Sequence, residues 1–180
     1  MDRPILFSTP MVKAILDGRK TMTRRVCKNA HIPCSPYQIG MRLWVRETFR
    51  YYDGEGDETV QQSIEYRADG DPNKKYKDLH WKPSIFMPRW ASRITLEITN
   101  VKVERLQEIT EGDAEKEGVQ PTLWFQPTKN EDDDLTLSDN IGHISYKNGF
   151  ANIWQKINGK KYPWASNPWV WVIEFERVAS

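Results

Sequence analysis

The sequence predicts a single α+β domain that folds around a small β-barrel or a strongly bent sheet, with inserted helices and two long loops. Three observations predict this fold. Short runs of alternating apolar residues, typical of strands, recur along the chain and are separated by helical patterns. The alternation over residues 94–103 changes phase near Thr99, which indicates a β-bulge of the kind that bends a sheet. A chain of 180 residues is long enough for one domain with a sizeable core.

The composition is that of a globular protein with a basic N-terminal part. Hydrophobic residues make up 38% and charged residues 28% of the chain, and the net charge is +1. Residues 1–50 hold ten Lys or Arg and three Asp or Glu, a balance of +7, whereas the remainder balances at −6. This asymmetry indicates a local anion site. No secretory signal and no run of the roughly 20 apolar residues that span a bilayer is recognised, so we expect a cytoplasmic protein without a membrane partner.

The first elements are a short strand and a helix. Residues 4–7 form an apolar run with the length of a strand. In the helix that follows, Thr9 is suited to the N-cap, Pro10 to the first helical position and Gly18 to the C′ position.

A strand over residues 20–25 comes next, because Thr21 and Thr23 are β-branched. Alternation places Lys20, Met22 and Arg24 on one face, and Arg19, Thr21, Thr23 and Arg25 on the other. A hydroxyl, an amine and several guanidinium groups suit an anionic ligand, or a nucleophile in electropositive surroundings. The alternative is a solvated edge strand that its charges protect from aggregation.

Three soft ligands follow the strand with the spacing Cys-x3-His-x2-Cys, at Cys27, His31 and Cys34. Such a group could hold zinc, but a fourth ligand would have to come from the distant His80 or His143. We therefore predict no metal and no cofactor, with the zinc site as the alternative.

The middle of the chain combines a strand with a loop excursion. Leu43 and Val45 alternate with their neighbours and predict a strand, whereas residues 51–82 are rich in Gly, Asp, Lys and Tyr and predict a loop with one short strand at 63–67. The runs 81–83 and 88–90 then interleave cations with tryptophans, as surfaces for single-stranded nucleic acid do. The alternative is that these tryptophans close the edge of a core.

A short helix over residues 110–117 is predicted, because Thr110 and Asp113 resemble a capping box with Asp in place of Glu and Gly118 is suited to the C′ position. Glu117 lies three residues after Ala114, the only small apolar residue of the helix, so the Glu117 carboxylate should point partly inward. Asp113 and Lys116 should face elsewhere.

The last part of the chain holds a loop, a helix and a strand. Residues 120–147, which include an acidic run, predict a surface loop. Apolar residues at helical spacing from Phe150 to Ile157 predict an amphipathic helix that Gly159 ends. Residues 168–178 predict a strand whose first half is apolar on both faces.

With these residues in place, the chain resembles the ASCH-domain family of the PUA-like superfamily of small β-barrels. Gly18, Lys20 and Arg25 match the signature Gly-x-Lys-x-x-Glu-x-Arg of the family. Thr23 stands where many members have glutamate, which is similar to the members that act as N4-acetylcytidine amidohydrolases. In those enzymes a lysine, a threonine and a helix glutamate are the proposed catalytic set, so the resemblance implies Lys20, Thr23 and Glu117 as catalytic residues.

Further segments look like a larger subgroup of the family that is found in bacteriophages and prophages. The resemblance then covers residues 1–180 as a single ASCH domain, with loop insertions at about 51–82 and 120–147 that the small amidohydrolases lack. The similar segments are residues 3–7, 43–48, 88–93 and 167–171.

The resemblance implies a protein that acts on RNA or modified nucleosides, by hydrolysing N4-acetylcytidine or a related N-acylated pyrimidine. Thr23 would supply the nucleophile, Lys20 would accept its proton, and Glu117 would pass the proton to the leaving amine. We expect these groups to converge at a surface pocket. The substrate-binding residues would be Arg19, Arg24, Arg25, Arg46, Trp44 and Trp90.

Two alternatives remain open. PUA-like barrels commonly bind RNA, so the protein could be a non-catalytic module for RNA or modified nucleotides, and some ASCH relatives suggest a ribonuclease. In each case the partner is a nucleoside or RNA, and a monomer is favoured.

Overall fold

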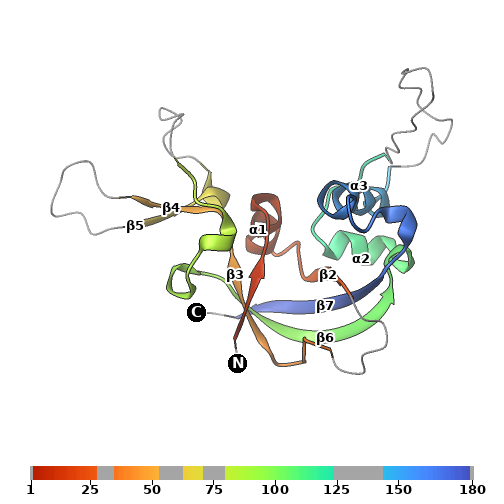
Figure 1. Ribbon diagram of the computed structural model, residues 1–180, viewed down its shortest axis with the longest axis horizontal. Helices are drawn as coiled ribbons and strands as arrows, with labels where there is room; N and C mark the ends of the chain where they lie inside the picture. Colours follow the sequence, from red (N-terminus) through yellow and green to blue (C-terminus); the bar gives the residue numbers. More distant parts are fainter. Residues whose placement is uncertain (1, 28–34, 53–62, 71–79, 124–143, 179–180) are drawn as a thin grey trace, which may run out of the picture. The chain divides into compact units, whose positions relative to one another are not determined.

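The computed structural model describes residues 2–27, 35–52, 63–70, 80–123 and 144–178 (Figure 1). The chain folds into two compact units that interleave along the sequence. Unit 1 consists of Met1–Gly18, Pro36–Val101 and Ile173–Ser180, and unit 2 consists of Arg19–Ser35 and Lys102–Val172. The prediction of a single domain over residues 1–180 stays a prediction.

The fold is mixed α+β, as the sequence predicts, with one five-stranded mixed sheet. In the order β1-β3-β6-β7-β2, the strands are β1 (Arg3–Leu6), β3 (Arg42–Arg46), β6 (Thr95–Arg105), β7 (Trp169–Val178) and β2 (Met22–Val26). The pair β1–β3 is parallel and the pair β3–β6 is antiparallel. Within the described residues the sheet is open, and no closed barrel is found there.

Unit 1 adds helix α1 (Thr9–Leu16) and the antiparallel hairpin of β4 (Phe49–Tyr52) and β5 (Ser63–Tyr66). Three 3₁₀ turns follow the hairpin: η1 (Arg67–Asp69), η2 (Ser84–Phe86) and η3 (Arg89–Ala91). A small apolar cluster of Phe49, Met87 and Ala91 lies beneath them. Strand β5 confirms the short strand predicted at 63–67, although it ends at Tyr66. Residues 53–62 and 71–79 of the predicted insertion lie outside the described residues.

The ends of α1 agree with the prediction at one terminus only. Ser8, and not Thr9, is the N-cap, because the extended Ser8 accepts the first helical hydrogen bond, from the amide of Val12 at 2.9 Å. Pro10 consequently occupies the second helical position, where its missing N–H costs nothing. Gly18 has a φ of +74°, a conformation that glycine adopts without strain, and it ends the helix as predicted.

Unit 2 is built from β2, helix α2 (Glu111–Lys116), helix α3 (Tyr146–Asn158) and the 3₁₀ turns η4 (Leu106–Glu108) and η5 (Trp164–Ser166). Parts of β6 and β7 belong to the same unit. Its core is apolar and takes residues from β2, η4, α2, α3, β7 and the turns beside α2: Met22, Leu106, Ile109, Ala114, Val119, Phe150, Trp154, Val170 and Val172. The burial of both Val170 and Val172 confirms that the first half of β7 is covered on the face opposite its tryptophans.

Helix α3 starts one turn earlier than its apolar pattern predicts. Ser145 caps it by accepting a hydrogen bond from the amide of Asn148 at 3.1 Å. The carboxylate of Glu111, on α2, accepts from the amides of Tyr146 and Lys147 at 2.8 and 3.2 Å. These polar contacts hold the first turn, so it needs no apolar residue at helical spacing. At the other end, Ile157 is 58% exposed and is not part of the core.

Strand β6 extends two residues beyond the predicted end, to Arg105, and the bulge near Thr99 stays a prediction. In the acidic insertion, residues 124–143 lie outside the described residues. Among the described residues, no helix combines the length and the apolar composition that crossing a membrane requires.

Gly149, in α3, is expected to tolerate no side chain. A Cβ at this position would lie 2.0 Å from the carbonyl oxygen of Gln120, so the backbone would have to move. We expect Gly149→Ala to lower the free energy of unfolding by about 1–3 kcal/mol, the usual cost of overpacking, in urea denaturation. Gly112→Ala in α2 is the control, because nothing lies within 4 Å of its Cβ position. An unchanged stability of Gly149→Ala would contradict the close packing of α3 on Gln120.

Candidate active site

Strand β2 and the end of helix α2 form the candidate active site, which lies entirely within unit 2. Lys20 and Glu117 pair as an isolated antiparallel β-bridge, and the amide of Thr21 donates to the carbonyl of Lys116 at 2.9 Å. The C-terminal end of α2 is therefore fixed to the segment that enters β2. Gly118, with a φ of +76°, turns the chain away immediately afterwards, as the sequence predicts.

The ammonium group of Lys20 is buried and lies among three acceptors. Nζ donates to the carbonyl of Met22 at 2.7 Å, to the carbonyl of Glu117 at 2.9 Å and to Oε2 of Glu117 at 2.7 Å. Burial lowers the pKa of Lys20 below its usual value, and the positive charges of Arg25 and Arg24 act in the same direction. The Glu117 carboxylate opposes this shift by stabilising the charged form. Lys20 is thus closer to giving up a proton than a surface lysine is.

Glu117 takes part in two ion pairs and is only 4% exposed. Its Oε2 accepts from Lys20, and its Oε1 lies 3.3 Å from Nη1 of Arg24. The inward orientation expected for Glu117 is therefore present in the structure.

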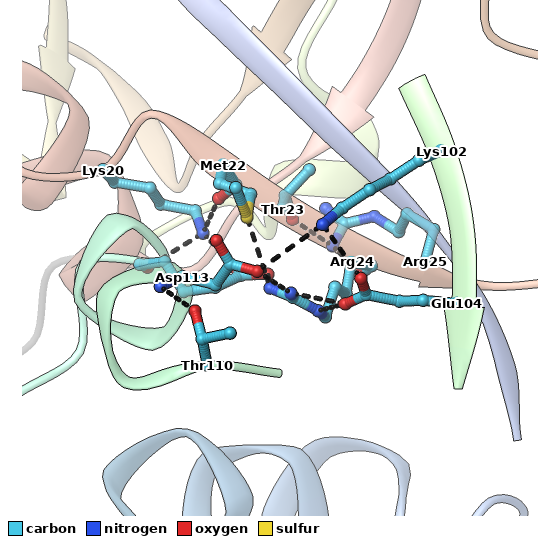
Figure 2. A network of polar contacts seen from close by, with 10 residues as sticks. Lys20, Met22, Thr23, Arg24, Arg25, Lys102, Glu104, Thr110 and Asp113 are labelled. Carbon is cyan, nitrogen blue, oxygen red and sulfur yellow. Dashed lines mark hydrogen bonds and ion pairs between the residues drawn. The ribbon is translucent and has the colours of Figure 1, made fainter. Parts of the chain in front are cut away.

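Arg24 lies at the centre of a network of charged side chains (Figure 2). Its Nη2 lies 2.6 Å from Oε1 of Glu104 on β6 and 3.0 Å from Oδ2 of Asp113 on α2. The side chain of Arg24 is fully buried, and its guanidinium lies 5.7 Å from the ring centroid of Phe150. Lys102 pairs with Glu104 at 3.0 Å at the exposed edge of the network.

The network is balanced in formal charge. It contains three cations (Lys20, Arg24, Lys102) and three carboxylates (Glu104, Asp113, Glu117). Because each buried cation has a carboxylate partner, the desolvation of these charges is compensated within the network. Arg24 accordingly holds acidic side chains of unit 2 in this structure, and its predicted role in substrate binding stays a prediction.

Three members of this network, Lys102, Glu104 and Asp113, are not among the residues predicted for the site. Asp113 was expected to face away from Glu117, and this expectation is wrong, since both carboxylates contact Arg24. The signal was available, because residues four apart on a helix are neighbours on its surface. Glu104 could not have been found this way, since its pairing with Arg24 joins two strands that are 80 residues apart.

Thr23 and Arg25 share the other face of β2, as alternation predicts. Nη1 of Arg25 donates to Oγ1 of Thr23 at 2.8 Å and to the carbonyl of Arg24 at 3.1 Å. Thr23 is 1% exposed, so other side chains cover it in this structure, and its place in a substrate pocket stays a prediction. Arg25 is half-buried, and Arg19 is exposed and donates to the carbonyl of Gly118 at 3.3 Å.

Three of the predicted substrate-binding residues belong to unit 1, so no contact with the site in unit 2 is described for them. The guanidinium of Arg46 lies over the Trp44 ring at 4.8 Å from its centroid, and Arg46 donates to the carbonyl of Met87 at 3.0 Å. Trp44 is buried in unit 1, whereas Trp90 is 68% exposed. Their roles toward a substrate stay predictions.

Of the predicted zinc ligands, only Cys27 and His80 lie within the described residues. His31, Cys34 and His143 lie outside them. In the part of the chain that the structure describes, no group of three or more His, Cys, Asp or Glu side chains is arranged to hold a metal ion.

No family model matches the chain, and neither a curated protein nor a solved structure matches it. The resemblance to the ASCH family therefore rests on the sequence motifs alone.

The lowered pKa of Lys20 predicts how the amine responds to its partner. In Glu117→Gln the carboxylate that stabilises the ammonium is gone, so the pKa of Lys20 should fall further below its usual value. Lysine-selective ¹³Cε NMR across pH 6–12 measures both titrations, with Lys20→Arg to assign the signal. Because burial lowers the pKa of Lys20, the folded state holds fewer protons than the unfolded state at pH values between the lowered pKa and the usual value of 10.5. The free energy of unfolding should therefore increase as the pH rises through this range. A Lys20 signal that titrates at or above its usual value would contradict the effect of burial.

Proposed function

We propose that the chain is an ASCH-family protein with the PUA-like barrel of that family, and that it hydrolyses N4-acetylcytidine or a related N-acylated pyrimidine. The observation that supports this most is the buried contact of 2.7 Å between Nζ of Lys20 and Oε2 of Glu117. It joins two of the three residues that the resemblance implies as catalytic, although 97 residues separate them in the chain. Thr23, the third, follows Lys20 on the same segment.

The proposed chemistry divides into acyl transfer and hydrolysis. Oγ1 of Thr23 attacks the acyl carbon of the amide, and its proton goes to the neutral amine of Lys20. The bond between the acyl carbon and N4 breaks, and N4 leaves as the amine after receiving the proton from Lys20 by way of Glu117. Water then cleaves the ester on Thr23, which releases the carboxylic acid and restores the hydroxyl group.

The contacts of the site support two parts of this scheme. The contact of 2.7 Å between Nζ of Lys20 and Oε2 of Glu117 allows a proton to pass from the lysine to the glutamate. Lys20 is then the neutral amine that the first step needs. Nη1 of Arg25, at 2.8 Å from Oγ1 of Thr23, stabilises negative charge that develops on that oxygen. Because Thr23 is buried, substrate binding must move the side chains that cover it.

A binding module without chemistry is the second candidate. The observation that favours it is the neutrality of the network, in which Lys20 already donates to three acceptors. Purely structural ion-pair networks also shift pKa values, so the shift at Lys20 fits this function too. In such a module the exposed Arg19 and the half-buried Arg25 would contact phosphates.

The test is incubation of the purified protein with N4-acetylcytidine, followed by chromatography. The amidohydrolase should release cytidine and acetate in equal amounts, and the rate should rise with pH through the lowered pKa of Lys20, because the base must be neutral. Absence of turnover on any N4-acylated cytidine, together with RNA binding that Arg25→Ala weakens, would decide for the binding module.

A further inference from the structure

Unit 1 carries an exposed aromatic ring beside its small apolar cluster. We call Trp90 and Tyr51, the ring on which it stacks, the aromatic platform. The rings of Tyr51 and Trp90 are stacked, with centroids 6.0 Å apart and planes inclined by 19°. Trp90 is nevertheless 68% exposed, so much of its ring surface faces solvent. The alternative that this tryptophan closes the edge of a core is therefore wrong for Trp90.

A cation accompanies the rings of the platform. Nζ of Lys82 lies 4.2 Å from the ring centroid of Tyr51, and Lys82 is exposed. A flat aromatic surface with a positive charge beside it is complementary to a nucleotide, which joins a flat base to an anionic phosphate.

We propose that the aromatic platform binds unpaired bases of a single-stranded nucleic acid. Trp90 stacks on a base, and Lys82 contacts the backbone. Bases of a duplex stack on one another and leave no face open to Trp90, so the ligand is a single strand. The proposal rests on the proposed function, because it names the polymeric form of the substrate.

The test measures binding directly, with a fluorescein-labelled decauridylate RNA and fluorescence anisotropy at several salt concentrations. Trp90→Ala should weaken binding by about 5- to 150-fold, the range for loss of one stacked base, and Trp90→Phe should recover part of the affinity. Ile39→Ala is the matched control, because Ile39 is 69% exposed and also belongs to unit 1. Lys82→Gln should reduce the slope of log affinity against log salt by about one unit.

Further arms identify the ligand and separate the two proposals. Decathymidylate DNA distinguishes RNA from DNA, and either one bound supports the proposal. Thr23→Val should bind RNA like the wild type, so loss of turnover and loss of binding remain separate results. Equal affinities of wild type and Trp90→Ala would overturn the proposal. The proposal would also be overturned if polyglutamate, a duplex or uridine monophosphate competed for the protein as well as a single strand does. None of these competitors is a single-stranded nucleic acid.

Discussion

Thr23→Val is expected to turn over N4-acetylcytidine at least about 10³-fold more slowly than the wild type, the size of loss seen when a nucleophile is removed. Valine keeps the β-branched shape, and this matters because Thr23 is 1% exposed and alanine would leave a cavity. Thr23→Ser retains a hydroxyl group and should recover part of the rate. The neighbouring Thr21→Val is the matched control, because Thr21 is exposed.

Lys20→Met should reduce turnover as severely as Thr23→Val does. Members of one catalytic unit are not additive, so the double variant should cost little more than either change alone. Steady-state kinetics measure these rates, and thermal unfolding checks that each variant is folded. If Thr23→Val retained full turnover while remaining folded, Thr23 would not be the nucleophile.

Arg24→Met is expected to have the largest effect on stability, about 3–5 kcal/mol, the range for removing one partner of a buried ion pair. The change leaves Glu104, Asp113 and Glu117 without the guanidinium that all three contact. Arg42→Met is the control, because Arg42 pairs with Glu97 at 3.6 Å on the surface. An exposed pair of this kind contributes about 0–1 kcal/mol.

Urea denaturation monitored by tryptophan fluorescence measures the effect of these substitutions. A second substitution tests the cause, since Asp113→Asn removes one of the three carboxylates that contact Arg24. The combination of Arg24→Met with Asp113→Asn should cost less than the sum of the two changes. Equal losses in Arg24→Met and Arg42→Met would show that the network contributes no more than a surface pair.

The local signals in the sequence predicted where elements begin and end. Gly18 and Gly118 end helices because each adopts a positive φ, a conformation that glycine allows at little cost. Thr110 caps α2 by accepting from the amide of Asp113 at 3.1 Å, as the capping pattern predicts. These features depend on residues a few positions apart, so the sequence expresses them directly.

The partners of buried charges were predictable only in part. Ala114 indicated which side of α2 is buried and therefore indicated Glu117. Its partner Lys20 lies 97 residues away in the sequence, so no local pattern identifies the pair. The burial of Thr23 was not predicted, because an isolated strand does not reveal what covers it. The tertiary structure decides this covering, and local alternation gives only the face.

The division of β6 and β7 between the two units has a consequence for the growing chain on the ribosome. Unit 2 needs Arg19–Ser35 and also the segment up to Val172, and unit 1 needs Ile173 onward in addition to its early residues. Domains of a growing chain generally fold one after another from the N-terminal end. Here neither unit is complete until β7 has emerged from the ribosome. Neither core can therefore form before the chain has been synthesised through β7.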